Sequence, residues 1–180
     1  MGRDKRALLV DGQPLLCRVL AALAEVADDL VVVESSRSPV PPDLLIGYAV
    51  RLVADRREDA GPLAGIEAGL SAAAAPLALV VAADAPSLQP ALLRLLAAEL
   101  GASEEAEAAL IVSDRGPEPL LAAYRSEVRI AASALLDRGE RRMGSLLDEL
   151  RVVNVGASVW RGVDPQGRSL RNVNAPADLA

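Results

Sequence analysis

The stretch LALVVAADAP, residues 77–86, decides how the rest of the chain is interpreted. Its first six residues are apolar and rich in leucine and valine, and Asp84 and Pro86 end the run. Such a run bounded by a turn signal predicts a buried strand over residues 77–82. Sheets built from buried parallel strands bind ligands just beyond the carboxyl ends of their strands. Asp84 is therefore the first candidate for a functional side chain.

On both sides of this stretch, short apolar runs alternate with segments of helical periodicity. We expect further strands at residues 30–33, 50–53, 109–112, 120–124 and 152–155. We expect helices at residues 15–27, 61 to about 74, 90–100, 128–136 and 143–150. The alternation predicts an α/β fold, a three-layer α/β/α sandwich around a mainly parallel, Rossmann-like sheet. The length of 180 residues and the lack of a repeat or linker predict one domain.

The composition limits the classes of function. Apolar residues are 52% of the chain and aromatics only 2%, so we expect a core of Leu, Val and Ala. A net charge of −6 argues against broad binding to nucleic acid or to an anionic membrane. One small anionic ligand in a locally basic pocket stays compatible with that charge.

The chain has no histidine and a single cysteine, Cys17. An intrachain disulfide, a Cys/His zinc site and a histidine-based triad are therefore excluded, and any metal would be held by oxygen ligands, for which Mg²⁺ is the natural candidate. No convincing secretory signal precedes the first helix, and the longest apolar stretch, residues 72–83, is too short to span a bilayer. We expect a cytoplasmic protein.

Lys5 is the only lysine beside 18 arginines. A lysine kept against that bias suggests a site that needs a compact ammonium, such as a phosphate site, although a solvated terminal lysine is the commoner case. Asp84 could hold Mg²⁺ beside nucleotide phosphates, or serve only as a turn or cap residue. Asp55 follows the strand expected at residues 50–53 and could accept hydrogen bonds from ribose hydroxyls, or be an ordinary turn residue.

Three further motifs each have a functional and a structural interpretation. The GPLAG motif, residues 61–65, opens a helix whose free N–H groups suit an anion or a base edge, or is an ordinary loop before that helix. Arg141 and Arg142 could grip a phosphate or belong to a solvated helix connection. Asn172 and Asn174 put two amides on one face of an extended segment, or form a capping turn.

The order of these motifs resembles that of the molybdenum cofactor guanylyltransferase family, nucleotidyltransferases with a GT-A-like Rossmann fold. The resemblance extends over nearly the whole chain. It rests on GRDK (residues 2–5), GQP (12–14), GPLAG (61–65), DAP (84–86), PL (119–120) with Tyr124, GERR (139–142) and NVN (172–174).

The resemblance implies a Mg²⁺-dependent transfer of GMP from GTP to the terminal phosphate of molybdenum-molybdopterin, with release of pyrophosphate. It implies catalytic roles for Lys5 and Asp84, with Asp84 as the metal ligand. It implies that Asn172, Asn174, Arg141 and Arg142 bind the acceptor substrate. The nucleotide site implied by the resemblance comprises Lys5, Asp55, Gly61, Pro62, Leu63, Gly65 and Asp84. Molybdoenzymes or their chaperones are the implied protein partners.

The chain also departs from the family pattern. The family's first strand and Gly-Gly loop are missing, so we expect an N-terminally incomplete nucleotidyltransferase domain over residues 1–180 with little activity as given. Residues 34–37, ESSR, stand where the family carries an asparagine-containing stretch near the base, and Glu118 stands where Gln or His is usual. Two alternatives therefore stay open: a related nucleotidyltransferase that uses CTP or a sugar phosphate, and a non-catalytic domain that binds molybdopterin or a protein partner.

Overall fold

The computed structural model describes residues 5–55, 57 and 60–171, and for Lys5 the backbone alone. The strands are β1 (Leu9–Val10), β2 (Gln13–Pro14), β3 (Leu30–Ser35), β4 (Val50–Asp55), β5 (Leu77–Val81), β6 (Ala108–Ser113), β7 (Gly116–Arg125) and β8 (Val152–Val155). The α-helices are α1 (Leu15–Ala24), α2 (Gly61–Ala72), α3 (Pro90–Gly101), α4 (Val128–Asp137), α5 (Met143–Asp148) and α6 (Ala157–Trp160). Short 3₁₀ helices cover Lys5–Ala7 (η1), Pro42–Leu45 (η2) and Arg168–Leu170 (η3).

Every strand and helix expected from the sequence is present, with ends that differ by a few residues. The hairpin of β1 and β2 was not expected. Its turn is Asp11-Gly12, whose φ angles are +50° and +79°. Two positive φ angles suit the tight turn between antiparallel strands, and an Asp-Gly pair is a known sequence signal for it. The helix α6 was also missed, because four residues are too few to show helical periodicity.

The main sheet has four strands in the order β5-β7-β6-β8. β6 and β8 are parallel, whereas β7 runs antiparallel to both of its neighbours, β5 and β6. Three of the four strands therefore share one direction. β3 and β4 form a separate parallel pair. The α/β class and the Rossmann-like arrangement are confirmed, and β7 is the one strand of the main sheet with reversed direction.

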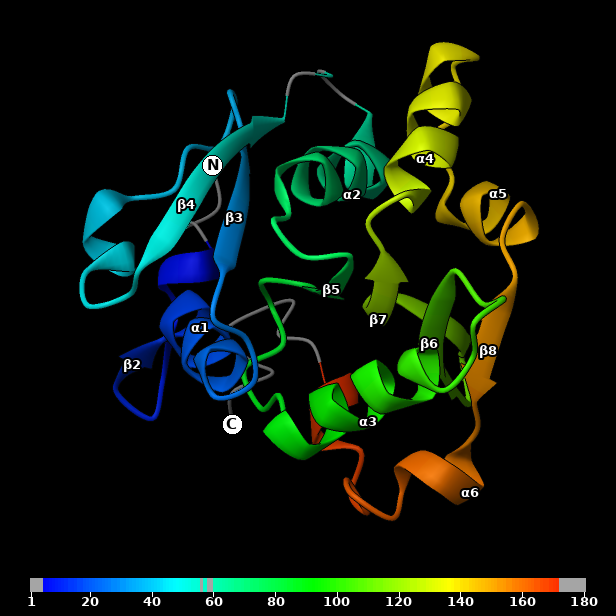
Figure 1. Cartoon of the computed structure of the whole chain (residues 1–180). Coiled ribbons are helices and arrows are strands. Elements are labelled where there is room, and N and C mark those ends of the chain that lie inside the picture. Colours follow the sequence, from blue (N-terminus) through cyan, green and yellow to red (C-terminus); the bar gives the residue numbers. More distant parts are fainter. Residues whose placement is uncertain (1–4, 56, 58–59, 172–180) are drawn as a thin grey trace.

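Helices cover both faces of the main sheet (Figure 1). Along β6, Ala109 and Ile111 pack into a core with α1, α3 and α6, whereas Ala108 and Leu110 pack into a second core with α2, α4 and α5. All four side chains are fully buried. Alternate residues of one strand thus fill two cores, as the pleat of a sheet requires. The three-layer sandwich expected from the sequence is confirmed.

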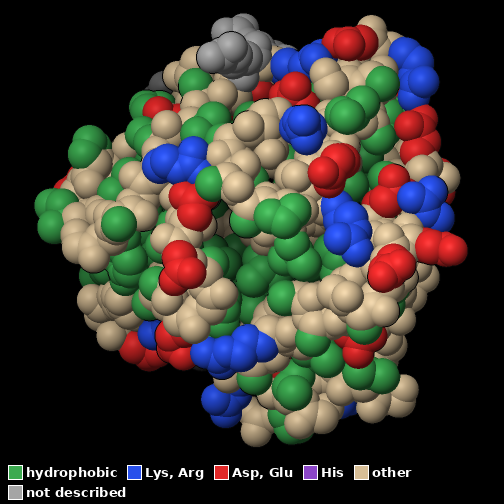
Figure 2. Space-filling model, viewed as in Figure 1, with side chains coloured by type: hydrophobic (Ala, Val, Ile, Leu, Met, Phe, Trp, Pro, Cys, Tyr) green, Lys and Arg blue, Asp and Glu red, His purple; other side chains and the backbone are tan. Residues whose placement is uncertain are grey.

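The two sheets are not joined by hydrogen bonds between strands in the described part of the chain. β5 is wholly apolar, yet each of its residues is only half-buried. Figure 2 shows apolar side chains in the hollow at the middle of this face, around the position of β5 in Figure 1. Helix α2 packs on both sheets: Val33 of β3 lies against Gly69, and Val80 of β5 packs against the core that contains Leu70. One helix therefore spans two sheet edges that have no strand between them.

The pairing of β6 with β7 is interrupted by an irregularity beside the end of β5. Leu110 pairs with Ala122, but the next residue, Ile111, pairs with Glu118. The hydroxyl of Tyr124 donates a hydrogen bond of 2.9 Å to the carbonyl of Pro119, inside the skipped segment. Burial raises the pKa of Tyr124, so the phenol stays a protonated donor. This hydrogen bond ties the irregular segment to the regular part of β7.

We predict that Tyr124→Phe lowers the free energy of unfolding by about 1–2 kcal/mol, because the Pro119 carbonyl loses a donor that is itself fully buried. Tyr48→Phe is the matched control, since the Tyr48 hydroxyl also donates 2.9 Å to a carbonyl, that of Cys17, but is only half-buried. Water can replace that donor, so we expect a smaller loss. Urea denaturation of the two variants measures the difference, and equal losses would contradict this account.

Candidate active site

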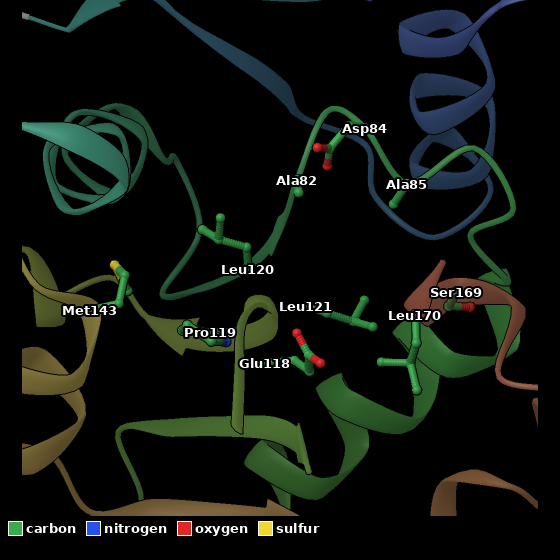
Figure 3. A pocket seen from close by; sticks show the side chains of 10 residues that line it. All are labelled: Ala82, Asp84, Ala85, Glu118, Pro119, Leu120, Leu121, Met143, Ser169 and Leu170. Atoms are coloured by element: carbon green, nitrogen blue, oxygen red, sulfur yellow. The ribbon is translucent and has the colours of Figure 1, made fainter. Parts of the chain in front are cut away.

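Asp84 lies in the turn that follows β5, three residues after the strand ends at Val81. The turn leads into α3, which begins at Pro90. The Asp84 side chain is partly exposed, and Figure 3 shows its carboxylate at one side of a cavity. The sequence-based placement of this residue beyond the carboxyl end of the strongest strand is therefore confirmed.

The segment around Asp84 is fixed to three other parts of the chain. The hydrogen bonds are Ala82 N–H to the Leu120 carbonyl (2.9 Å), Arg18 Nε to the Pro86 carbonyl (2.9 Å) and Gln89 N–H to Ser169 Oγ (3.0 Å). They come from β7, from α1 and from η3. A carboxylate on a segment held at both ends keeps a defined position, as a ligand site requires.

The cavity beside Asp84 has a volume of about 200 Å³. Its walls come from the Asp84 turn, the first half of β7, the start of α5 and η3. Besides Asp84, the residues that decide its chemistry are Glu118, Met143, Ser169 and Leu170 (Figure 3). As far as the structure describes the chain, the lining holds two carboxylates and no Lys or Arg. Bound phosphate would therefore need an accompanying cation in this cavity.

The antiparallel course of β7 brings Glu118 to Asp84. Val81 of β5 pairs with Leu121, so the residues before Leu121 continue past the carboxyl end of β5. The first half of β7 thus forms the wall across from the Asp84 turn. In the sequence, Glu118 stands out only as a departure from the family pattern, because apolar periodicity predicts a strand without its direction or its partner.

The Glu118 carboxylate is held by the β6–β7 hairpin. Its Oε1 accepts a hydrogen bond of 2.7 Å from the Ser113 hydroxyl and one of 3.1 Å from the guanidinium of Arg115. The Glu118 side chain is 23% exposed, whereas that of Arg115 is 65% exposed. The carboxylate therefore lies at the cavity wall, and the exposed Arg115 guanidinium partly balances its charge from outside the cavity.

The η3 wall of the cavity is organised by Asp164, a 2% exposed carboxylate that no sequence motif had indicated. Its two oxygens each accept a hydrogen bond of 2.9 Å, from the N–H groups of Arg168 and Ser169. Ser169 is itself 2% exposed, and its hydroxyl accepts the N–H of Gln89 at 3.0 Å. The sequence DPQG at residues 164–167 is a turn signal that could have indicated this loop.

Apart from Asp84 and Lys5, the predicted nucleotide residues lie outside this cavity lining. Asp55 is the last residue of β4, not a residue after it, and its carboxylate accepts the Arg57 N–H at 2.8 Å. Gly61 begins α2 with a φ of +67°, which a glycine adopts without strain. Leu63 is fully buried, so only its backbone could contact a ligand. The structure does not bring these residues into one cavity with Asp84.

Arg141 and Arg142 do not line the cavity, but they precede a residue that does. Both are exposed, and Arg142 directly precedes α5, whose first residue, Met143, lines the cavity. The Glu140 carboxylate accepts the N–H groups of Arg142 at 2.9 Å and Arg141 at 2.8 Å, and these hydrogen bonds lower the pKa of Glu140. The loop that presents the two guanidiniums is thus folded back on Glu140.

The remaining predicted residues cannot be placed completely. The backbone of Lys5 begins η1, but its side chain is outside the described residues. Asn172 and Asn174 also lie outside them, directly after the segment in which Leu170 lines the cavity. Their roles stay predictions.

A metal in this site would depend on its substrate for most of its ligands. Among the described residues no group of three or more His, Cys, Asp or Glu side chains could hold an ion. Asp84 offers one carboxylate beside a cavity, which suits a hard cation that takes further oxygens from phosphate and water. The donor set therefore fits Mg²⁺ brought with a nucleotide better than a preformed metal cage.

Comparison with solved structures defines the class of protein. The 2-C-methyl-D-erythritol 4-phosphate cytidylyltransferase of Thermus thermophilus aligns over 99% of this chain and 91% of its own, with a TM-score of 0.72 at 19% identity. The likeness at that identity shows the fold alone. Molybdopterin-guanine dinucleotide biosynthesis protein A of Archaeoglobus fulgidus aligns over 99% of this chain and 88% of its own, with a TM-score of 0.80 at 27% identity. The fold is that of the nucleotidyltransferases.

Sequence comparison then gives the family. The profile described as "MobA-like NTP transferase domain" matches residues 1–153. A "probable molybdenum cofactor guanylyltransferase" of Chloroflexus aggregans is 36% identical over 99% of this chain and 85% of its own length. A molybdenum cofactor guanylyltransferase of Burkholderia vietnamiensis is 34% identical over 86% of this chain and 78% of its own. The chain belongs to the MobA-like NTP transferase family, and the resemblance drawn from the motifs is confirmed.

None of the helices in the described part of the chain combines the length and the apolar character needed to cross a membrane.

Proposed function

We propose that this protein transfers GMP from GTP to the terminal phosphate of molybdopterin and releases pyrophosphate. The observation that carries the proposal is Asp84, fixed at the carboxyl end of β5 beside a cavity, in a chain of this family. Relatives described as molybdenum cofactor guanylyltransferases match nearly the whole chain, which supports this choice of nucleotide and acceptor.

In the proposed reaction an oxygen of the molybdopterin phosphate attacks the α-phosphorus of GTP, and the bond to pyrophosphate breaks. When bound, Mg²⁺ would neutralise the phosphate oxygens as charge shifts to the leaving group. Asp84 would hold this ion, and Lys5 would contact the nucleotide phosphates. No side chain forms a covalent intermediate, so the protein contributes by orientation and by charge stabilisation.

The two substrates would occupy opposite sides of Asp84. We assign the nucleotide to the side of Asp55 and the GPLAG segment, where Gly61, Pro62, Leu63 and Gly65 present the backbone of the first turn of α2. We assign the acceptor to the cavity of Glu118 and Met143. Arg141 and Arg142 directly precede Met143 in the sequence. Asn172 and Asn174 follow Leu170 by two and four residues.

We further propose that residues 1–180 form one nucleotidyltransferase domain whose sheet takes an additional strand between β3 and β5. Both of these strands have an edge without a hydrogen-bonded partner in the described part of the chain, and α2 packs against both. β5 is apolar, but its residues are only half-buried, as expected for a strand that a further strand would cover at its open edge. A strand in that position would pair with the open edges of β3 and β5 and join the two sheets.

The proposed setting is the cytoplasm, where GTP and Mg²⁺ are available. Molybdoenzymes or their chaperones are the proposed recipients of the product. The net charge of −6 continues to argue against nucleic acid or an anionic membrane as a partner.

We predict that Asp84→Asn removes the Mg²⁺-dependent stabilisation of the protein by GTP. A ligand at 100 times its Kd stabilises by about 2.7 kcal/mol, which a thermal-shift assay detects. Asp148→Asn is the control, because Asp148 is an exposed carboxylate at the end of α5 and lines no part of the cavity. The control variant should behave like the unaltered protein.

The same assay with CTP tests the choice of base. This choice needs a test because Glu34, in the segment that departs from the family pattern, uses its carboxylate to accept the Val40 N–H at 2.6 Å. Stabilisation by CTP and not by GTP would overturn the guanylyl assignment. Stabilisation by neither nucleotide would favour a non-catalytic domain.

We predict that the 180-residue chain has little guanylyltransferase activity and that an N-terminal strand with a Gly-Gly loop, grafted from the Archaeoglobus fulgidus relative, raises it on the order of 100-fold. A matched graft with two alternate strand residues changed to proline should not raise activity, because proline lacks the N–H that strand pairing needs. Measurement of pyrophosphate release compares the three proteins. Full turnover by the 180-residue chain alone would refute the need for the strand.

A further inference from the structure

Arg115 joins two walls of the cavity from outside. One nitrogen of its guanidinium donates 3.1 Å to Oε1 of Glu118 and 3.1 Å to the carbonyl of Leu170. Glu118 belongs to the β7 wall and Leu170 to the η3 wall. The two residues are 52 positions apart in the sequence, and Arg115 is their common hydrogen-bond partner.

The position of Arg115 is itself well defined. Its backbone N–H donates 3.1 Å to the hydroxyl of Ser113, and the same hydroxyl donates 2.7 Å to Glu118. Arg115 sits in the tight turn between β6 and β7, where Gly116 has a φ of +107°. Backbone, hydroxyl and carboxylate thus form a small closed network around one guanidinium.

Two other contacts join the same hairpin to the segment after β8, but neither reaches the cavity. The indole of Trp160 donates 3.1 Å to the carbonyl of Val112, and Arg161 lies 3.8 Å from the carboxylate of Asp114. These contacts attach α6 to the hairpin. Among the described hydrogen bonds and ion pairs between the hairpin and the segment after β8, only the one from Arg115 to Leu170 reaches a residue that lines the cavity.

We propose that Arg115 is a positioning residue for the acceptor substrate. By holding Leu170 to Glu118 it fixes the width of the acceptor side of the cavity and the point from which the chain continues to Asn172. The inference rests on the proposed function, because it assigns this cavity to the pterin phosphate. It adds a residue that contacts no substrate and acts through the walls it joins.

The role of Arg115 matters most for an anionic ligand, because the described lining of the cavity holds two carboxylates and no Lys or Arg. Glu118 alone would repel a phosphate that enters beside it, and the Arg115 guanidinium offsets that charge while it fixes the wall. Loss of Arg115 would therefore widen one side of the cavity and leave the Glu118 carboxylate uncompensated there. The nucleotide side, at Asp55 and α2, shares none of these contacts.

The test compares Arg115→Ala with Arg161→Ala in the full chain. Arg161→Ala is the matched control: it removes the same charge from a different contact between the hairpin and the segment after β8, at a side chain that is 54% exposed against 65% for Arg115. Pterin fluorescence gives the Kd for molybdopterin, calorimetry gives the Kd for GTP with Mg²⁺, and hydrogen exchange reports on residues 167–171.

For Arg115→Ala we expect the Kd for molybdopterin to rise about fivefold, as the loss of one partly exposed ion pair allows, and exchange in residues 167–171 to quicken about as much. The Kd for GTP should stay within about twofold of the unaltered value. Arg161→Ala should leave both Kd values unchanged.

Equal affinity of Arg115→Ala and the unaltered protein for molybdopterin would overturn the inference. An equal loss for both ligands, or the same loss in Arg161→Ala, would also overturn it by showing a general structural effect. If the unaltered chain binds neither ligand, the proposed function fails instead, and the exchange measurement alone then decides whether Arg115 holds the segment.

Discussion

The antiparallel pairing of β5 with β7 is the constraint on which the site depends. It sets Val81 opposite Leu121, and the hydrogen bond from the Ala82 N–H to the Leu120 carbonyl extends it past the end of β5. The Asp84 turn therefore begins from a fixed point. Beyond Leu121 the same strand continues to Glu118, which pairs with Ile111 of β6, so β7 links the positions of the two carboxylates.

The loops around the site are held to these strands by hydrogen bonds of polar groups, and less by the packing of large side chains. The chain has one tryptophan, two tyrosines and no phenylalanine, so large aromatic side chains are scarce. Buried polar groups hold the loops instead. Asp164 accepts two backbone N–H groups, Ser169 accepts that of Gln89, and Tyr124 holds the carbonyl of Pro119. Hydrogen bonds of this kind fix direction as well as distance, which apolar contacts between Leu, Val and Ala do not.

Periodicity and turn signals were enough to predict most of the elements and the α/β class, since the strands at residues 77–82, 109–112 and 152–155 are mainly apolar in composition. They could not predict the direction of β7, which depends on partners distant in the chain. For that reason the sequence did not indicate that Glu118 and Asp84 line the same cavity. Asp164 was not predicted, because the local sequence does not distinguish a buried aspartate that accepts loop N–H groups from an exposed one. Lys5, Asn172 and Asn174 stay predictions.

The central claim is that Asp84 holds the metal of a nucleotide whose phosphates reach the cavity. Crystals grown with Mn²⁺ and a non-hydrolysable GTP analogue test it directly, because the anomalous signal of Mn²⁺ locates the ion without assumptions. The account predicts one strong peak within about 2.5 Å of an Asp84 carboxylate oxygen, with the remaining ligands from phosphate and water. A peak held by other carboxylates, with the nucleotide bound away from Asp84, would contradict it.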